Sequence, residues 1–270
     1  MTVIWGLDLK EMQWGKFKSS YMWNTEYHLR RTKFIVYQCA MIFCVVSESL
    51  GTAALSDYVD QQKFVSMLDY HAHVHNNNYI GAASYNIFVG IYVATIFGAA
   101  FFFDLFWPER YESPAVKVAW RICSVLACVF ALSSALTLTI ITATKSAYVS
   151  GVNAAHASDL LAAYGGSPMR YRDNGRAIAS VVFLWPGFLG TVGSTVLMWK
   201  SLSHNDALGP KSAHAREAEK GFAGAPTTAD STSDPSTDAP VADGHTAAAA
   251  DGVTRPDSVH VNGPQPHQVV

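Results

Sequence analysis

Apolar side chains are concentrated in four long stretches of the chain, separated from one another by polar residues. The stretches cover residues 34–55, 85–107, 118–143 and 177–199. A helix needs about 20 residues to cross a hydrocarbon layer of about 30 Å, so each stretch is long enough to span a membrane. A soluble protein would have to enclose four helices that are apolar on every face, and too little of the chain is amphipathic to do so. The pattern predicts an all-α membrane protein in which residues 34–200 form a four-helix transmembrane bundle.

The regions on either side of the bundle differ in composition. Residues 1–33 are polar, aromatic and basic, without a short apolar run before a cleavage site, so we expect no removable signal peptide. Their interleaved aromatic residues and lysines are typical of a segment on an anionic membrane surface, or of an ordinary solvated segment. Residues 201–270 contain a single aromatic residue, Phe222. Because this composition cannot bury a core, we expect a disordered C-terminal tail.

The distribution of Lys and Arg predicts the orientation, because basic flanks tend to stay on the cytoplasmic side of a membrane. Of the 19 basic residues, 14 lie before the first stretch, near the short connection between the second and third, or after the fourth. The other five lie in the two long loops on the opposite side. We therefore expect both termini in the cytoplasm and the protein in the plasma membrane or an endomembrane.

All four cysteines fall inside the apolar stretches, so we expect no disulfide in the long loops. Within each pair a spacing of five residues places the thiols about 140° apart on a helix, which is a poor geometry for metal ligands. We interpret these cysteines as small, buried packing residues. They are Cys39, Cys44, Cys123 and Cys128.

Small residues recur within the third and fourth stretches at positions where helix backbones approach one another. We interpret them as packing seams whose partner helix lies in the same chain or in a second copy. The residues are Ala127, Ala131, Ala135, Gly187, Gly190, Gly193 and Ser194.

Glu48 is an acidic residue in the middle of the first stretch, where an uncompensated charge costs several kcal/mol. Its helical neighbours are mostly small, so we expect the carboxyl group to point into the bundle, where Ser133, Ser134, Thr137 and Thr139 offer hydroxyls. Three interpretations stay open. Glu48 is a neutral acid that hydrogen-bonds across helices, a functional group that relays protons or binds a cation or lipid headgroup, or a hydrated residue at shallower depth.

Asp104 and Arg121 fall near the same membrane surface, at the end of the second stretch and the start of the third. An ion pair between them would close the short connection. We predict such a structural pair or simple snorkelling to the interface, with a ligand-binding role as the alternative.

The first long loop contains three histidines at alternate positions, His71, His73 and His75. They share one face only if the segment is extended, and they would then offer imidazoles to zinc or copper. The alternative is an exposed polar loop. In the second long loop, Ser150 to Tyr164 followed by Gly165 and Gly166 predicts a short helix.

The sequence indicates neither nucleic-acid binding nor a known catalytic motif. With a net charge of −2 and no basic face bearing stacked aromatics, nucleic acid is not an expected partner. The chain contains no nucleophile elbow, zinc-protease motif, phosphate-binding loop or dinucleotide fingerprint. We therefore expect no enzymatic activity and no cofactor.

Three segments resemble MARVEL-type tetraspan proteins. They are LRRTKFIVYQ before and in the first stretch, FFFDLFWPERYESP at the end of the second, and VAWRICSVLACVFALSSALTLTIITA in the third. The resemblance covers roughly residues 30–200. It implies four helices with cytoplasmic ends and a role in membrane organisation, apposition or vesicle traffic, through helix packing and lipid contact rather than catalysis.

Our leading hypothesis is a non-enzymatic protein that organises membrane domains or scaffolds membrane partners. Its expected partners are membrane lipids, further copies or other membrane proteins at small-residue helix faces, and a cytoplasmic partner of the tail. The alternatives are a small transporter or channel-like protein that uses Glu48, and an accessory subunit of a membrane enzyme.

Overall fold

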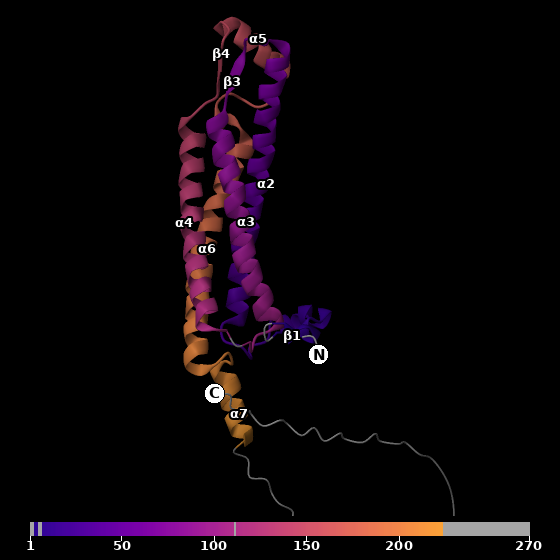
Figure 1. Ribbon diagram of the computed structural model, residues 1–270, viewed down its shortest axis with the longest axis vertical. Coiled ribbons are helices and arrows are strands. Elements are labelled where there is room, and N and C mark those ends of the chain that lie inside the picture. Colours follow the sequence, from indigo (N-terminus) through magenta and orange to yellow (C-terminus); the bar gives the residue numbers. More distant parts are fainter. Residues whose placement is uncertain (1–2, 5–6, 111, 224–270) are drawn as a thin grey trace, which may run out of the picture. The chain divides into compact units, whose positions relative to one another are not determined.

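Four long helices form an antiparallel bundle in the computed structural model, which describes residues 3–4, 7–110 and 112–223 (Figure 1). They are α2 (Arg30–Leu68), α3 (Asn77–Phe106), α4 (Pro114–Thr144) and α6 (Gly175–Leu208). Each is long and apolar enough to cross a membrane. Helices α2 and α4 each contact both α3 and α6. The predicted all-α, four-helix membrane fold is confirmed.

Shorter elements lie at the two ends of the bundle (Figure 1). We call the end that carries the N-terminal segment and α7 the terminal end, and the end that carries the two long loops the loop end. At the terminal end are β1 (Val3–Ile4), β2 (Leu7–Asp8), η1 (Leu9–Glu11), η2 (Trp14–Phe17), α1 (Ser19–Met22) and α7 (Ala213–Ala223). At the loop end are β3 (His73–His75), β4 (Tyr148–Ser150), α5 (Ala154–Tyr164) and η3 (Tyr171–Asp173).

Helix α2 continues well beyond the apolar stretch that predicts it, from residue 55 to Leu68. The extension is stabilised by the loop end, where the ring of Tyr58 lies 5.1 Å from Tyr79 and 5.3 Å from Tyr171. The side chain of Gln61 donates to the carbonyl of Ser167 at 3.0 Å. Because these contacts come from residues distant in sequence, hydropathy alone ends the helix too early.

The helix predicted for residues 150–164 is present as α5, but it begins at Ala154. Its first turn is capped by the Asn153 side chain, which accepts from the backbone N–H of His156 at 2.8 Å. It ends where predicted, because Gly165 adopts the left-handed conformation with φ of 61°. Residues 148–150 instead form β4, which pairs antiparallel with β3 and so joins the two long loops.

The region predicted as a disordered tail begins with ordered structure. Helix α6 continues to Leu208, and α7 follows at Ala213–Ala223. Ser201 and Leu202 are buried, and the Ser201 hydroxyl accepts a hydrogen bond from the Lys33 ammonium at 3.0 Å. The boundary at residue 201 is therefore wrong. The rest of the predicted tail, residues 224–270, lies outside the described residues.

Gly187, Gly190 and Gly193 of α6 face α2, which identifies their partner helix within the chain. A Cβ on Gly187 would lie 2.8 Å from the Cys44 sulfur, and a Cβ on Gly190 would lie 3.0 Å from the Cα of Ala40. Only glycine permits so close an approach of two helix backbones. We call this contact the α2–α6 seam.

The cysteines do not share one environment. All four are free thiols; Cys44 is buried in the α2–α6 seam, whereas Cys123 and Cys128 are half-buried. Cys39 is exposed on the outside of α2, so the interpretation as a buried packing residue is wrong for it. Its helical position faces away from the partner helices, which spacing alone did not reveal.

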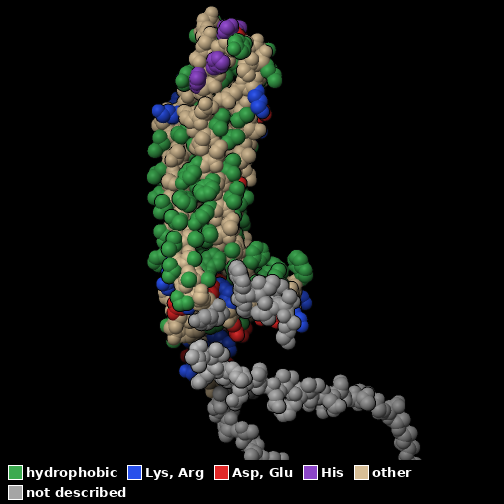
Figure 2. Space-filling model, in the orientation of Figure 1, with side chains coloured by type: hydrophobic (Ala, Val, Ile, Leu, Met, Phe, Trp, Pro, Cys, Tyr) green, Lys and Arg blue, Asp and Glu red, His purple; other side chains and the backbone are tan. Residues whose placement is uncertain are grey.

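Large apolar side chains cover the outward faces of the bundle, and charged side chains gather toward its two ends (Figure 2). We call this apolar surface the apolar belt. In a membrane it would face lipid, which is the solvent such side chains prefer. It includes Ile42, Val45, Phe88, Ile91, Val125, Val129, Ile140, Val182, Leu189 and Val196.

The α2–α6 seam predicts opposite effects for two Gly→Ala substitutions. Gly190→Ala places a methyl group against the α2 backbone and should cost about 1–3 kcal/mol of stability. Gly81→Ala is the matched control, because a Cβ there meets nothing within 4 Å in α3. It should leave stability unchanged or raise it by about 0.5–1 kcal/mol. Unfolding in detergent, followed by tryptophan fluorescence, measures both, and equal effects would contradict the seam.

Candidate functional site

A network of uncharged polar side chains joins the four helices at the centre of the bundle. It consists of Ser47 on α2, Asn86 on α3, Ser134 on α4 and Ser180 on α6, each at most 1% exposed. The amide of Asn86 donates to the Ser47 hydroxyl at 3.2 Å and accepts from the Ser134 hydroxyl at 3.1 Å. The hydroxyls of Ser47 and Ser180 each donate to the other residue's backbone carbonyl at 2.8 Å. We call these four residues the central network.

The central network has a structural rather than a chemical character. Its members are a carboxamide and three hydroxyls, which neither ionise near neutral pH nor lie beside a base that would activate them. Because each helix contributes one member, the hydrogen bonds fix the rotation of all four helices relative to one another. Of the four residues only Ser134 is singled out from sequence, as an expected partner of Glu48, although an amide such as Asn86 within an apolar stretch is a detectable signal.

Glu48 lies at the contact between α2 and α3. Its carboxylate rests against Gly90, where a Cβ would overlap it. The residue is half-buried, and its backbone carbonyl accepts a hydrogen bond from the Thr52 hydroxyl at 2.8 Å. No described residue hydrogen-bonds its carboxylate. Gly90 thus provides the space that the acid occupies.

The hydroxyls expected to receive Glu48 have other positions or partners. Ser133 pairs with the hydroxyl of Tyr85 at 2.7 Å, and Ser134 belongs to the central network. Thr139 accepts from the indole of Trp185 at 3.2 Å, and Thr137 is exposed. They lie on α4, whereas the Glu48 carboxylate points to α3.

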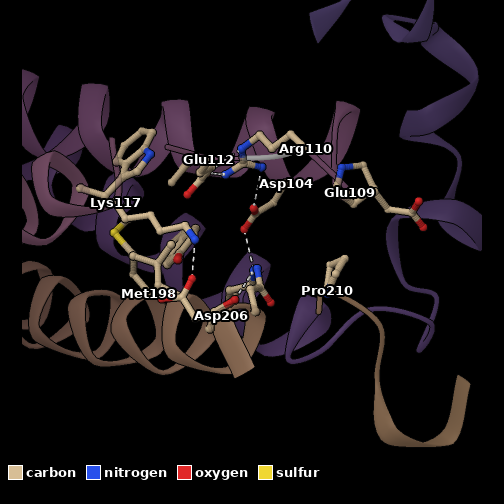
Figure 3. Close-up of a pocket in the computed structure, with 16 residues that line it drawn as sticks. Asp104, Glu109, Arg110, Glu112, Lys117, Met198, Asp206 and Pro210 are labelled. Carbon is tan, nitrogen blue, oxygen red and sulfur yellow. Dashed lines mark hydrogen bonds and ion pairs between the residues drawn. The ribbon is translucent and has the colours of Figure 1, made fainter. Parts of the chain in front are cut away.

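At the terminal end, Asp104 is the centre of a cluster of charged side chains (Figure 3). Its carboxylate accepts from the Lys33 ammonium at 2.7 Å and from the Arg110 guanidinium at 3.1 Å. Arg110 also pairs with Glu112. The three charged groups around Asp104 come from the start of α2 and the connection between α3 and α4, so the cluster ties these segments together.

The predicted ion pair between Asp104 and Arg121 is wrong. Arg121 lies 3.7 Å from Asp206 near the end of α6, and Lys117 pairs with the same carboxylate. Both cations are on the face of α4 that meets α6, while Asp104 on α3 meets α2. Asp104 does close the connection after α3, through Arg110 rather than Arg121.

A cavity of about 340 Å³ lies among these charged residues. Asp104, Arg110, Glu112, Lys117 and Asp206 line it (Figure 3). Apart from Glu109, the carboxylates and cations in its wall are paired with one another, so the cavity presents mixed charge rather than one sign. Such a wall suits water or a zwitterionic group better than a simple ion.

Arg30 begins α2 and is buried among aromatic rings. Its guanidinium carbon lies 4.6 Å from the ring centre of Tyr21, 5.1 Å from Tyr27 and 5.3 Å from Phe34. Its three side-chain nitrogens make no hydrogen bond within the described residues. Cation–π attraction is stronger when the cation is removed from water, so these rings hold the N-terminal segment to the bundle.

The segment before α2 and the segment after α6 are also joined at the terminal end. The rings of His28 and His204 stack with centres 3.6 Å apart. Burial and the nearby His204 and Lys33 lower the pKa of His28, so the stacked ring is neutral at neutral pH. The backbone N–H of His28 donates to the Pro210 carbonyl at 3.1 Å.

The three loop histidines do not gather around one point. His73 and His75 lie on strand β3, but His71 precedes it in a turn, where its N–H donates to Asp69 at 2.9 Å. The His75 ring lies 2.7 Å from the Ser150 hydroxyl and stacks on Tyr148. Within the described part of the chain, no group of three His, Cys, Asp or Glu residues is arranged to hold a metal ion.

No known protein family, curated protein or solved structure matches this chain. The class of protein therefore follows from the fold itself. Four apolar spanning helices and the apolar belt define a multi-pass integral membrane protein.

The Lys33–Asp104 and Arg121–Asp206 ion pairs at the terminal end differ in burial, so we expect mutation of one to cost more stability than mutation of the other. Asp104→Asn leaves Lys33, which is 9% exposed, without its counter-charge and should cost about 3 kcal/mol. Arg121→Gln removes an exposed pair and should cost less than about 1 kcal/mol. Unfolding of both variants in detergent measures the difference. A larger loss for Arg121→Gln would contradict this charge arrangement.

Proposed function

We propose that this protein is a non-enzymatic, MARVEL-like organiser of membrane domains or membrane partners. The observation that carries the proposal is the contrast between the interior and the surface of the bundle. The interior is held by the central network and the α2–α6 seam, and the surface is a broad apolar belt. Such a bundle acts on its surroundings through its outer faces.

The interior supports this function because its polar groups already bond to one another. A solute pathway needs hydrated polar or charged groups along its length. At the level of the central network, Asn86 and Ser47 instead face partners from neighbouring helices at hydrogen-bonding distance. The cavity of about 340 Å³ lies at the terminal end, among the charged side chains there.

The proposed orientation places the terminal end in the cytoplasm. This orientation is supported by the larger number of Lys and Arg residues at the terminal end. They include Lys33 and Arg110 of the charged cluster around Asp104. Both termini then face the cytoplasm, where the part of the predicted tail beyond α7, residues 224–270, would bind a partner. Lipids, further copies of the chain or other membrane proteins would contact the apolar belt.

Glu48 supports a second candidate, a small proton-linked transporter. Its carboxylate lies against Gly90 at the α2–α3 contact without a hydrogen bond from any described residue. An acid in this position would bind and release a proton if water reached it. One acid alone does not make a pathway across the membrane.

Reconstituted vesicles separate the two candidates. Wild-type protein and Glu48→Gln are each placed in vesicles that contain a pH-sensitive dye and a fluorescent phospholipid. An organiser should give no proton flux above empty vesicles in either form. It should slow lipid diffusion, measured by fluorescence recovery, equally in both, because Glu48→Gln leaves the apolar belt intact.

One result would favour the transporter over the organiser. A proton flux that wild-type protein supports and Glu48→Gln abolishes would establish the transporter and refute the organiser. Ser49→Ala, at the neighbouring and more exposed position on the same helix, is the control for a nonspecific loss of flux.

A further inference from the structure

The N-terminal segment and the terminal end of α3 form an apolar groove of about 500 Å³. Met12, Trp14 and Phe17 line one side, and Phe102, Phe103 and Phe106 line the other. The volume lies within the range of about 300–1,000 Å³ usual for small-ligand sites. In Figure 1 the segment projects sideways from the bundle next to the end of α3.

Specific contacts hold the segment against α3, so the groove has fixed walls. The Lys16 ammonium donates to the Phe106 carbonyl at 2.6 Å, and the Trp107 indole donates to the Asp8 carbonyl at 2.9 Å. The rings of Phe17 and Phe106 meet edge to face with centres 5.6 Å apart. The first bond occupies the Phe106 carbonyl at the end of α3, and together these contacts orient the segment across that end.

The walls of the groove leave much apolar surface uncovered. Trp14 is 88% exposed, Met12 is 56% exposed and Phe102 is 49% exposed. Hydrophobic side chains of the segment gather on the side that faces the apolar belt (Figure 2). Because Phe102 belongs to a spanning helix, the groove opens toward the lipid at the membrane surface.

We propose that this groove holds one acyl chain of an anionic glycerophospholipid, with its phosphate beside Lys10 and Lys18. Both lysines are exposed and adjoin groove-lining residues in sequence, Lys10 two positions before Met12 and Lys18 directly after Phe17. Within the described residues neither belongs to an ion pair, whereas Lys16 is paired with Glu11. Lysines at a membrane surface attract anionic lipids. The aromatic walls accept the chain, and the lysines select the headgroup.

A lipid is the occupant that the position favours. The groove lies between an interfacial segment and a spanning helix, where acyl chains are the most abundant apolar groups and reach it without crossing water. The proposal requires only that the chain spans a membrane. It therefore stands or falls independently of the proposed organising role.

Lipid retention tests the groove directly. Full-length protein is extracted with mild detergent from vesicles of equal phosphatidylserine and phosphatidylcholine, and native mass spectrometry records the bound lipid. Wild-type protein should retain one phosphatidylserine, preferred about thirtyfold over phosphatidylcholine, as two lysines would provide. Met12→Asp places a charge in the groove and should abolish retention.

Matched variants separate the groove from general effects. Met67→Asp makes the same change at a residue that is 84% exposed at the loop end, and it should retain the lipid. Met12 lies outside the bundle, so Met12→Asp should unfold at the same temperature as wild-type protein. Lys10→Gln with Lys18→Gln should keep one bound lipid but lose the preference for phosphatidylserine.

Three results from native mass spectrometry would overturn the proposal. These are equal retention by wild-type protein and Met12→Asp, equal retention of the two lipids by wild-type protein, and a dimer that Met12→Asp dissociates. The last result would assign the groove to a second copy of the chain. Quenching by brominated phosphatidylserine provides a second measurement, with the Trp14 signal taken as the difference between wild-type protein and Trp14→Phe. If this signal is quenched no more strongly than by brominated phosphatidylcholine, the proposed site is excluded.

Discussion

The structure depends on one constraint, that polar groups within a hydrocarbon layer must find partners inside the protein. The backbone meets it by forming α2, α3, α4 and α6, whose hydrogen bonds are internal. The side chains meet it at the central network, where Asn86 bonds to Ser47 and Ser134 while Ser180 and Ser47 satisfy one another. Because the network takes one side chain from each helix, it determines which faces turn inward and which form the apolar belt.

The two ends of the bundle are held by different interactions, because water and lipid headgroups are available there. At the terminal end, Lys33 and Arg110 neutralise Asp104, and aromatic rings surround Arg30. At the loop end, the β3–β4 pairing and the ring of Tyr58 against Tyr171 fix the long loops on the extension of α2. The N-terminal segment is part of this architecture, since its bonds to the end of α3 create an apolar groove between the segment and that helix.

Hydropathy alone predicted the four helices because lipid exposure requires long apolar runs. It could not predict the extension of α2, since Tyr58 is buried by rings from other elements. The glycines of α6 were recognisable from sequence, but their partner helix was not. The charged pairs show the limit most clearly: Asp104 and Arg121 lie near the same surface, yet helix rotation turns them toward α2 and α6 respectively. That rotation depends on long-range bonds such as Asn86 to Ser47, which no local pattern specifies.

The closed interior of the bundle is tested most directly by the reactivity of a native thiol. Cys44 is buried in the α2–α6 seam one helical turn from Glu48, so a water path through the interior of the bundle at this level would wet this thiol. Intact vesicles containing the wild-type protein are treated with a charged, membrane-impermeant methanethiosulfonate, and mass spectrometry locates the modified cysteines. A closed bundle predicts that Cys44 stays unmodified until the protein is denatured. Modification of Cys44 in intact vesicles would contradict it.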